Sequence, residues 1–280
     1  MAIASVVIPA HDEASVIERC LRRLLDGAER GELEVVVVCN GCHDETAELA
    51  RRAAPEALVI EIPVASKVAA LNAGDGAASV FPRCYLDADV ELGIDALRAT
   101  VQALADGALC AAPAPHHLVE GRTWVVRRFY AAHERLPFFT GPGVVGNGVY
   151  VLSRAGRARF GRFPELTADD QFVLERFASA ERATVRSHRF VIHPPRTVAG
   201  VIKVRTRSYR GNAELRARVT AEEPDDAAGG AWALGLLGDR SVTTAVPVWL
   251  GINAIAKVNA RRARGRRSTV WERDDSSRAR

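Results

Sequence analysis

The sequence predicts an α/β fold in which a doubly wound, mostly parallel central sheet carries helices on both faces. Apolar runs rich in β-branched residues recur at 4–9, 34–39 and 58–62, and residues 83–86 lead into a fourth strand. Between these runs, apolar residues return at the spacing of an amphipathic helix. Strands that alternate with helices in this way form βαβ units and a parallel sheet. The run 34–39 contains four consecutive valines, which is typical of a strand buried on both faces.

Each helix between these strands has its own signal. The apolar residues of 14–25 fall on one helical face, and 44–54 begins with Asp44 as a candidate N-cap. Residues 67–78 form the third predicted helix. We expect the first strand to stop at Pro9, because proline has no N–H to donate to a sheet.

The second half of the chain is less regular. Helices are predicted at 94–106, 123–136 and 169–180. A strand at 149–152 follows the glycine-rich segment 141–148, and residues 222–230 have the small, polar composition of a linker. The apolar stretch 242–258 has Pro247 in a position suited to a first helical turn. A C-terminal helical tail is therefore expected.

Composition limits the class of protein. The chain has a net charge of +4, and arginines are concentrated after residue 260. This excess belongs to the tail, so it does not indicate a nucleic-acid-binding face. The five cysteines show no disulfide framework, which favours a reducing cytoplasm. The sequence has no signal peptide and no run of ~18 apolar residues, so neither secretion nor a membrane-spanning helix is expected.

Polar side chains directly follow three of the predicted strands. The clusters are His11-Asp12-Glu13, Asn40-Gly41-Cys42-His43-Asp44 and Asp87-Ala88-Asp89. The carboxyl ends of parallel strands meet at one edge of a sheet, where such folds bind ligands. Helix N-termini point to the same edge and favour negative charge. We therefore expect these clusters to form one crevice for an anionic ligand.

Asp87 and Asp89 form an Asp-x-Asp pair at the end of the fourth strand. In an extended segment, residues two apart project to one side, so both carboxylates can face one point. Mg²⁺ and Mn²⁺ prefer such oxygen ligands and are commonly shared with substrate phosphates. A solvated turn with two acids is the alternative for an isolated pair, but the position after a buried strand favours a metal site.

Cys39 and Cys42 have the C-x-x-C spacing of redox motifs and of half zinc sites. No second C-x-x-C pair is present in the sequence to complete a zinc site. The pair also overlaps the turn that the strand-end argument assigns to a ligand. We therefore interpret the spacing as incidental.

Four short segments occur in a characteristic order and spacing. They are Val7 to Glu13, Val37 to Thr46, Lys67 to Gly74 and Tyr85 to Asp89. Together they resemble the N-terminal half of the family 2 inverting glycosyltransferases of GT-A fold, and the resemblance extends over roughly residues 3–215. It implies one GT-A domain at 1–222, with a nucleotide-sugar-binding half (1–92) and an acceptor and catalytic half (93–222). Residues 223–280 would be a linker, an amphipathic helix and a basic tail.

The resemblance assigns donor-binding roles to residues at these strand ends and beyond. Glu13 would lie near the ribose, and Asn40 stands where the family often has an aspartate that contacts the base. Lys67 and Asn72 would face the nucleotide and its phosphates. The complete implied donor set is Pro9, Ala10, His11, Glu13, Asn40, Asp44, Lys67, Asn72, Asp87, Gly146, Asn147, Lys203, Arg207 and Arg210.

Catalysis is assigned to Asp169 and Asp170, which resemble the family's Glu-Asp pair. By that match Asp170 is the general base, because an ionised carboxylate can take the acceptor proton as the oxygen attacks. Asp89, together with Asp87, would bind Mg²⁺ or Mn²⁺, and Arg210 would contact the diphosphate. The alternative for Asp169 and Asp170 is that they are acids at a helix N-terminus, where the helix dipole favours them. The alternative for the basic segment that contains Arg210 is a solvated helix face.

The implied activity is a metal-dependent, inverting transfer of a single sugar from a nucleotide-diphosphate donor, with a UDP-sugar expected. The acceptor would be a hydroxyl of a glycan, a lipid-linked sugar or a small molecule. The Gln-x-x-Arg-Trp signature of processive synthases is absent from the sequence, which favours a single transfer. One alternative is a nucleotidyltransferase acting on sugar phosphates, but the glycine- and arginine-rich loop of those enzymes does not follow the first strand. The other is a non-catalytic nucleotide-sugar-binding protein.

The tail leaves two interpretations open. An apolar helix followed by arginines can lie on an anionic membrane surface, and it can equally pack against the catalytic domain. In the first case the enzyme would be cytoplasmic and peripheral on the inner face of the membrane.

Overall fold

The computed structural model describes residues 1–136, 147–218 and 243–263. The chain forms two compact units. The first comprises residues 1–116, 142–165 and 169–192, and the second comprises 117–141, 166–168 and 193–280. The boundary expected between residues 222 and 223 falls outside the described residues, so the division of the chain predicted from the sequence stays a prediction.

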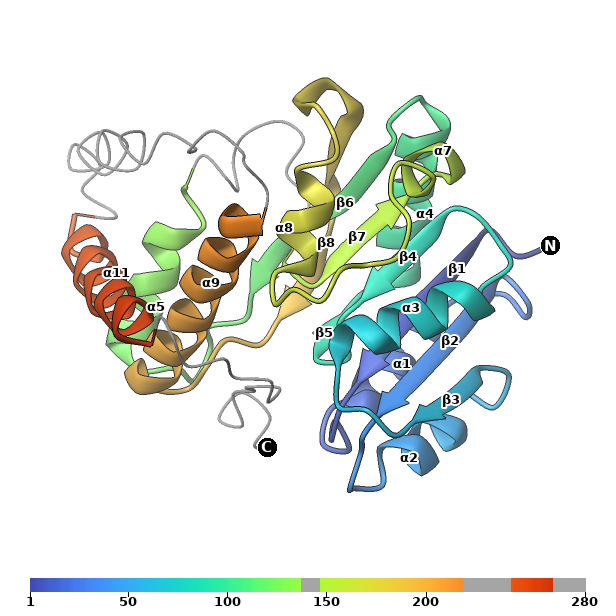
Figure 1. Cartoon of the computed structure of the whole chain (residues 1–280), viewed down its shortest axis with the longest axis horizontal. Helices are drawn as coiled ribbons and strands as arrows, with labels where there is room; N and C mark the ends of the chain where they lie inside the picture. The colour runs from blue at the N-terminus through green and yellow to red at the C-terminus, as the bar shows by residue number, and fades with distance from the viewer. Residues whose placement is uncertain (137–146, 219–242, 264–280) are drawn as a thin grey trace. The chain divides into compact units, whose positions relative to one another are not determined.

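An eight-stranded sheet organises the first unit (Figure 1). Its strands are β1 (Ala4–Ala10), β2 (Leu33–Asn40), β3 (Leu58–Ile62), β4 (Arg83–Leu86), β5 (Val90–Glu91), β6 (Cys110–His117), β7 (Val149–Leu152) and β8 (Arg182–Ile192). The helices are α1 (Ile17–Leu25), α2 (Thr46–Ala53), α3 (Lys67–Ala77), α4 (Ile94–Ala105), α7 (Arg154–Arg157) and α8 (Asp169–Leu174). The strand order is β3-β2-β1-β4-β7-β6-β8-β5. Strands β3, β2, β1 and β4 pair in parallel, whereas β4–β7, β6–β7 and β5–β8 are antiparallel. The predicted α/β fold is confirmed.

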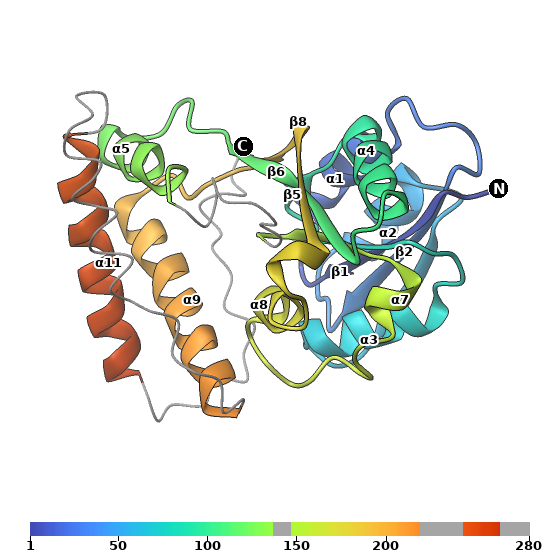
Figure 2. The ribbon, with the colours of Figure 1, turned by 90° about the horizontal axis from the view of Figure 1, so that it is seen from above.

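Alternate residues of β1 and β2 face opposite sides of the sheet, as the pleat requires. Val6 and Ile8 belong to a buried cluster that also contains residues of α1, α2 and α4. Val7 faces α3 on the opposite side of the sheet. Helices thus cover both faces of the sheet (Figure 2). A Cβ added at Gly74 of α3 would lie 2.4 Å from Val7 Cγ1. Glycine at this position therefore allows α3 to lie close enough to the sheet to position its first residue, Lys67.

The first strand continues past its predicted end. Pro9 pairs with Val38 inside the parallel ladder, and β1 ends at Ala10. The prediction that the strand stops at Pro9 was wrong, because one missing N–H removes a single ladder bond and the buried apolar neighbours hold the strand in place. As a consequence, Pro9 and Ala10 are buried within the sheet and the first loop begins at His11.

The strands β5, β6 and β8 were not predicted, and the end of α8 was misplaced. β6 contains Pro113 and Pro115, and β8 exposes polar residues at 186–189, so neither shows a clean alternation. The helix expected at 169–180 ends at Leu174 as α8, and a 3₁₀ turn (Ser179–Glu181) precedes β8. The sequence therefore predicts elements with a strong local pattern, and it does not predict strands without a regular alternation.

In the described part of the second unit, three helices pack together: α5 (Trp124–His133), α9 (Val198–Arg218) and α11 (Ala245–Arg262). Phe129 of α5, Val201 of α9 and Ile252 of α11 share one buried cluster. The helix expected at 242–258 is thus present as α11, and one face of it packs on its neighbours. Leu250 and Ile255 of α11 remain exposed, and the contact with an anionic membrane stays a prediction. None of the helices in the described residues is both long and apolar enough to span a bilayer.

Candidate active site

The loops after β1 and β2 are in direct contact, as expected for neighbouring parallel strands. The Nδ1 of His11 lies 2.7 Å from the carbonyl oxygen of Asn40, and the backbone N–H of His43 donates to Asp12 Oδ1 at 2.6 Å. Asp44 Oδ2 also accepts a hydrogen bond from the N–H of Ala14 at 3.1 Å. The predicted meeting of the first two polar clusters at one edge of the sheet is therefore present.

Several residues expected to contact the nucleoside have internal partners. With its amide nitrogen facing Ala10, Asn40 donates to the Ala10 carbonyl at 2.6 Å and accepts from Ser66 N at 3.1 Å. Asn40 is completely buried, as is Ala10, and Glu13 is only 3% exposed. Glu13 N donates to Thr46 Oγ1 at 2.7 Å. These contacts join the ends of β1 and β2 to α2 and α3, and the direct nucleoside contacts of these residues stay predictions.

A cavity of about 280 Å³ opens beside the turn that follows β2. Its lining residues are Cys39, Gly41, Cys42, His43, Glu61, Ile62 and Pro63. Gly41 has a φ of 58°, and a Cβ there would lie 2.8 Å from Ala65 N, so the turn requires glycine. A hydrogen bond with Cys39 lowers the pKa of the Cys42 thiol to about 7. None of the five cysteines, all of which are described, forms a disulfide.

The clearest charge cluster is centred on Lys67, the first residue of α3. Its Nζ lies 2.8 Å from Asp87 Oδ1 and 2.9 Å from Asp169 Oδ1. Burial lowers the pKa of Lys67, but the carboxylates of Asp169 and Asp87 outweigh burial and raise it above the ordinary value. Lys67 is therefore a fixed cation that joins the end of β4 to the start of α8. The sequence predicted a phosphate contact for Lys67 and did not predict this double ion pair.

The two aspartates at the start of α8 have different environments. Asp169 is 5% exposed, and Tyr150 OH donates to its Oδ2 at 3.3 Å. Burial raises the pKa of Asp169 to about 6, although the Lys67 ammonium opposes the rise. Asp170 is half-buried, and its Oδ2 accepts a hydrogen bond from Asn147 N at 3.3 Å. Asp169 is thus enclosed by the protein, and Asp170 is the more accessible carboxylate of the pair.

Residues 147 and 148 link this acid pair to Asp87. Asn147 has a φ of 65° and Gly148 a φ of 96°. The Gly148 carbonyl accepts a hydrogen bond from Asp87 N at 2.8 Å, while Asn147 N donates to Asp170. A Cβ on Gly148 would lie 2.9 Å from Val90 Cγ2. The predicted place of Asn147 beside the donor sugar stays a prediction, and Gly146 lies outside the described residues.

Asp87 and Asp89 lie in a turn between β4 and β5. Val90 N donates to Asp87 O at 3.1 Å, which closes the turn. The extended geometry expected for this pair was wrong, because β5 leaves the direction of β4 to pair with β8. Both side chains are nevertheless half-buried. Their oxygen ligands suit Mg²⁺ or Mn²⁺, and the Lys67 ammonium pairs with one oxygen of Asp87.

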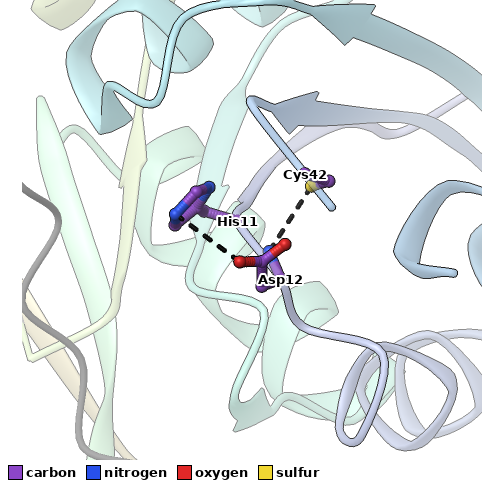
Figure 3. Close-up of side chains that lie close together, drawn as sticks. All are labelled: His11, Asp12 and Cys42. Atoms are coloured by element: carbon purple, nitrogen blue, oxygen red, sulfur yellow. Dashed lines mark hydrogen bonds and ion pairs between the residues drawn. The ribbon is translucent and has the colours of Figure 1, made fainter. Parts of the chain in front are cut away.

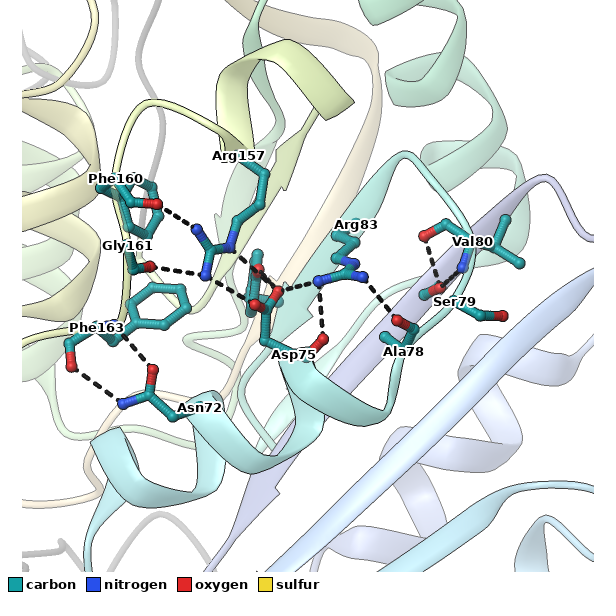
Figure 4. Close-up of polar contacts among 12 residues, drawn as sticks. Asn72, Asp75, Ala78, Ser79, Val80, Arg83, Arg157, Phe160, Gly161 and Phe163 are labelled. Carbon is teal, nitrogen blue, oxygen red and sulfur yellow. Dashed lines mark hydrogen bonds and ion pairs between the residues drawn. The ribbon is translucent and has the colours of Figure 1, made fainter.

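Asn72 and Asp75 of α3 hold the segment around Phe163 against the helix (Figure 4). Asn72 Nδ2 donates to Phe163 O at 3.0 Å, and Phe163 N donates to Asn72 Oδ1 at 2.9 Å. Asp75 accepts from Arg157 Nη2 at 2.7 Å and from Tyr85 OH at 2.6 Å. Burial raises the pKa of Asp75, but these hydrogen bonds outweigh burial and lower it. Both atoms of the Asn72 amide have protein partners, so its predicted nucleotide contact stays a prediction.

The basic residues expected at the diphosphate lie on α9 in the second unit. Lys203 is exposed, whereas Arg207 and Arg210 are half-buried. On the same unit, Arg205 Nε donates to Asn253 Oδ1 at 3.0 Å and Tyr209 OH donates to the same oxygen at 2.8 Å. The phosphate contacts of Lys203, Arg207 and Arg210 stay predictions.

Comparisons with known proteins agree with this fold. A mannosyltransferase from Pyrobaculum calidifontis, solved with GDP-mannose and Mn²⁺, is 21% identical with a TM-score of 0.63, over 91% of this chain and 75% of that one. A glucosyl-3-phosphoglycerate synthase from Mycobacterium tuberculosis, solved with Mn²⁺, UDP and glucosyl-3-phosphoglycerate, is 20% identical with a TM-score of 0.56, over 79% of this chain and 81% of that one. At this identity the likeness concerns the fold. A search of curated protein sequences gives no match.

The sequence profile of glycosyl transferase family 2 matches residues 5–162, which is more than half of the chain. This segment contains β2, β3 and β4, all but the first residue of β1, and Lys67 and Asp87 of the charge cluster. The strand order, the acids after β4 and the extent of this match lead to one conclusion. The chain belongs to glycosyl transferase family 2 and is a glycosyltransferase.

Proposed function

We propose that this enzyme transfers one sugar, with inversion at the anomeric carbon, from a nucleoside-diphosphate donor to a hydroxyl acceptor. The observation that carries the proposal is the cluster of Asp87, Lys67 and Asp169, next to which Asp170 is held by Asn147. A UDP-sugar is the expected donor. The mannosyltransferase and the synthase to which the chain is similar were solved with GDP-mannose and UDP, respectively, so both nucleotides belong in the test.

Asp170 is proposed as the general base. The acceptor oxygen forms a bond to the anomeric carbon while the bond from that carbon to the diphosphate oxygen breaks. Asp170 takes the proton of the acceptor hydroxyl as that bond forms. The N–H of Asn147 orients the Asp170 carboxylate, and Lys67 keeps the neighbouring Asp169 in a fixed position. The inner position of Asp169 gives it a supporting role in this scheme.

Asp89 and Asp87 would hold Mg²⁺ or Mn²⁺ through their carboxylate oxygens. The bound ion supplies Lewis-acid stabilisation of the leaving diphosphate. The Lys67 ammonium balances the charge of Asp87 and Asp169, so the carboxylates can lie close together before a nucleotide binds. Arg210, with Arg207 and Lys203, would add positive charge for the diphosphate.

The experiment compares Asp170→Asn with wild type and with Glu175→Gln, which changes a carboxylate near the C-terminal end of α8. Purified proteins are first screened by thermal shift against UDP, GDP, dTDP and their sugars, with and without Mn²⁺. A ligand at a hundred times its Kd adds ~2.7 kcal/mol of stability, which is enough to rank donors. Asp170→Asn should keep the shift with the best donor and lose ~10²–10⁴-fold in transfer rate.

Product analysis then separates this proposal from its rivals. Release of the nucleoside diphosphate and an inverted anomeric centre in the product support an inverting transfer. Pyrophosphate release would instead indicate a nucleotidyltransferase, and donor binding without turnover would indicate a binding protein. Undiminished transfer by Asp170→Asn would reassign the base. Asp89→Ala should abolish the part of the thermal shift that depends on Mn²⁺, and an unchanged shift would remove Asp89 from the metal site.

A further inference from the structure

Cys42 has a second set of neighbours besides Cys39. Its side chain lies beside His11 and Asp12, which come from the loop after β1 (Figure 3). The Nδ1 or Nε2 of His11, a carboxylate oxygen of Asp12 and the Sγ of Cys42 all lie within 4.8 Å of one another. All three residues are half-buried. The cluster therefore combines nitrogen, oxygen and sulfur atoms at one point, which the C-x-x-C spacing alone does not reveal.

These three residues lie close together because they are in the loops that follow two neighbouring strands. β1 and β2 are parallel neighbours in register from Ala4 to Ala10, so the loops that follow them begin side by side. Asp12 adopts a φ of 48°, an uncommon conformation for a residue other than glycine. Its N–H donates to Cys42 Sγ at 3.4 Å, and its Oδ1 accepts from His43 N at 2.6 Å. The sulfur and the carboxylate are thus both fixed relative to the first loop.

The hydrogen bond of His11 sets its tautomer. A carbonyl oxygen can only accept, so the 2.7 Å contact with Asn40 O requires His11 Nδ1 to carry the proton. In the neutral imidazole, Nε2 then has the lone pair, and it lies 3.9 Å from Asp12 Oδ2 on the side of the cluster. A histidine whose other N–H donates to a backbone carbonyl is the usual arrangement of a metal ligand.

We propose that Cys42 Sγ, His11 Nε2 and a carboxylate oxygen of Asp12 form a binding site for Zn²⁺, with water as the fourth ligand. Zinc binds thiolate, imidazole and carboxylate ligands at ~2.0–2.3 Å, which places tetrahedral ligand atoms ~3.5 Å apart. The side chains need to close by about 1 Å from their largest separation. The site differs from that of Asp87 and Asp89, whose oxygen ligands suit harder ions.

Zinc at this position would compete with the sugar donor, because His11 belongs to the predicted nucleoside site. This consequence rests on the proposed function, whereas the binding of zinc does not. Cys42 also lines the cavity beside the turn that follows β2, together with Gly41 and His43.

Cobalt provides a direct test with the full chain, because Co²⁺ occupies zinc sites and shows a sulfur-to-metal charge-transfer band. Wild type should develop this band on titration with Co²⁺ and lose it when Zn²⁺ is added, but retain it in excess Mg²⁺. Cys42→Ser should lack the band, and His11→Gln should bind at least ~10-fold more weakly. The matched control is Cys39→Ser, which changes the other cysteine of the same turn and should keep the band.

Absence of the band from wild type, its persistence in Cys42→Ser or its loss from Cys39→Ser would each overturn the assignment. Alkylation of unmodified wild type provides a measurement that needs no variant. Zn²⁺ should slow the reaction of Cys42 with iodoacetamide, mapped by mass spectrometry, and an unchanged rate would also overturn the site. If zinc binds as described and sugar transfer is not inhibited, the zinc site stands and the nucleoside assignment of His11 fails.

Discussion

Replacement of Asp169 by asparagine is expected to stabilise the protein at neutral pH, although Asp169 lies in the candidate active site. The side chain is 5% exposed, and burial raises its pKa from 3.8 to about 6. A group whose pKa is higher in the folded state binds more protons there, so the free energy of unfolding decreases as pH rises between the two values. The contribution of Asp169 is complete below about pH 3.8 and is lost as pH rises through about 6.

The magnitude follows from the two pKa values. The difference between 3.8 and about 6, at about 1.4 kcal/mol per pH unit, corresponds to about 3 kcal/mol at neutral pH. The ion pair with Lys67 is already included, because the pKa of about 6 is the value in the presence of the ammonium. Asparagine is neutral at every pH and resembles the protonated aspartic acid in shape. The variant therefore avoids the cost of an ionised carboxylate at this position.

The assay is urea unfolding followed by circular dichroism at pH 4.5 and pH 7.5, with EDTA to remove metal. The stability difference between Asp169→Asn and wild type should grow by most of this ~3 kcal/mol between the two conditions. Glu48→Gln, which neutralises an exposed acid on α2, is the control and should show little change. A difference that does not grow with pH, or an Asp169→Asn variant less stable than wild type at pH 7.5, would refute the role assigned to burial.

Three further substitutions test the supports of the site. Gly148→Ala forces a residue with a φ of 96° against Val90 and should cost ~1–3 kcal/mol in urea unfolding, whereas Gly76→Ala, with open space around it on α3, should cost nothing. Asp75→Ala leaves the half-buried Arg157 guanidinium without its carboxylate and should cost ~1–3 kcal/mol, so an unchanged Tm would contradict the network. Asn72→Ala should cost ~1–3 kcal/mol and speed amide exchange at Phe163, and unaltered exchange would show that the amide pair is dispensable.

The parallel part of the fold could be predicted because local and tertiary preferences agree there. The valines of β2 are buried on both faces, and α3 begins and ends within one residue of its expected bounds. The antiparallel part could not be predicted, since β6 has two prolines and β8 has four consecutive exposed residues. Their strand character comes from pairing in the sheet, which a local pattern does not record.

The sequence named most of the residues of the candidate site, but it did not indicate which of them contact one another. The position of polar residues after parallel strands was enough to single out Asp87, whereas Lys67 and Asp169 were assigned from the family resemblance. The pairing of Lys67 with both acids depends on the distance between α3 and α8, which are remote in the sequence. Asn40 was expected to contact a base, but its buried amide joins Ala10 to Ser66, and no sequence signal separates these two uses of an asparagine.

The left-handed backbone conformations of Asp12 and Asn147 have a consequence for efforts to make this catalyst more heat-resistant. They are the non-glycine residues with positive φ in the described part of the chain, and each carries a conformational cost of ~1 kcal/mol. Glycine would relieve that cost at either position, yet it would also delete the polar side chain presented there. Substitutions that raise thermal stability at these two loops would therefore remove polar side chains of the candidate sites. A consensus or directed-evolution programme should direct its changes to other positions.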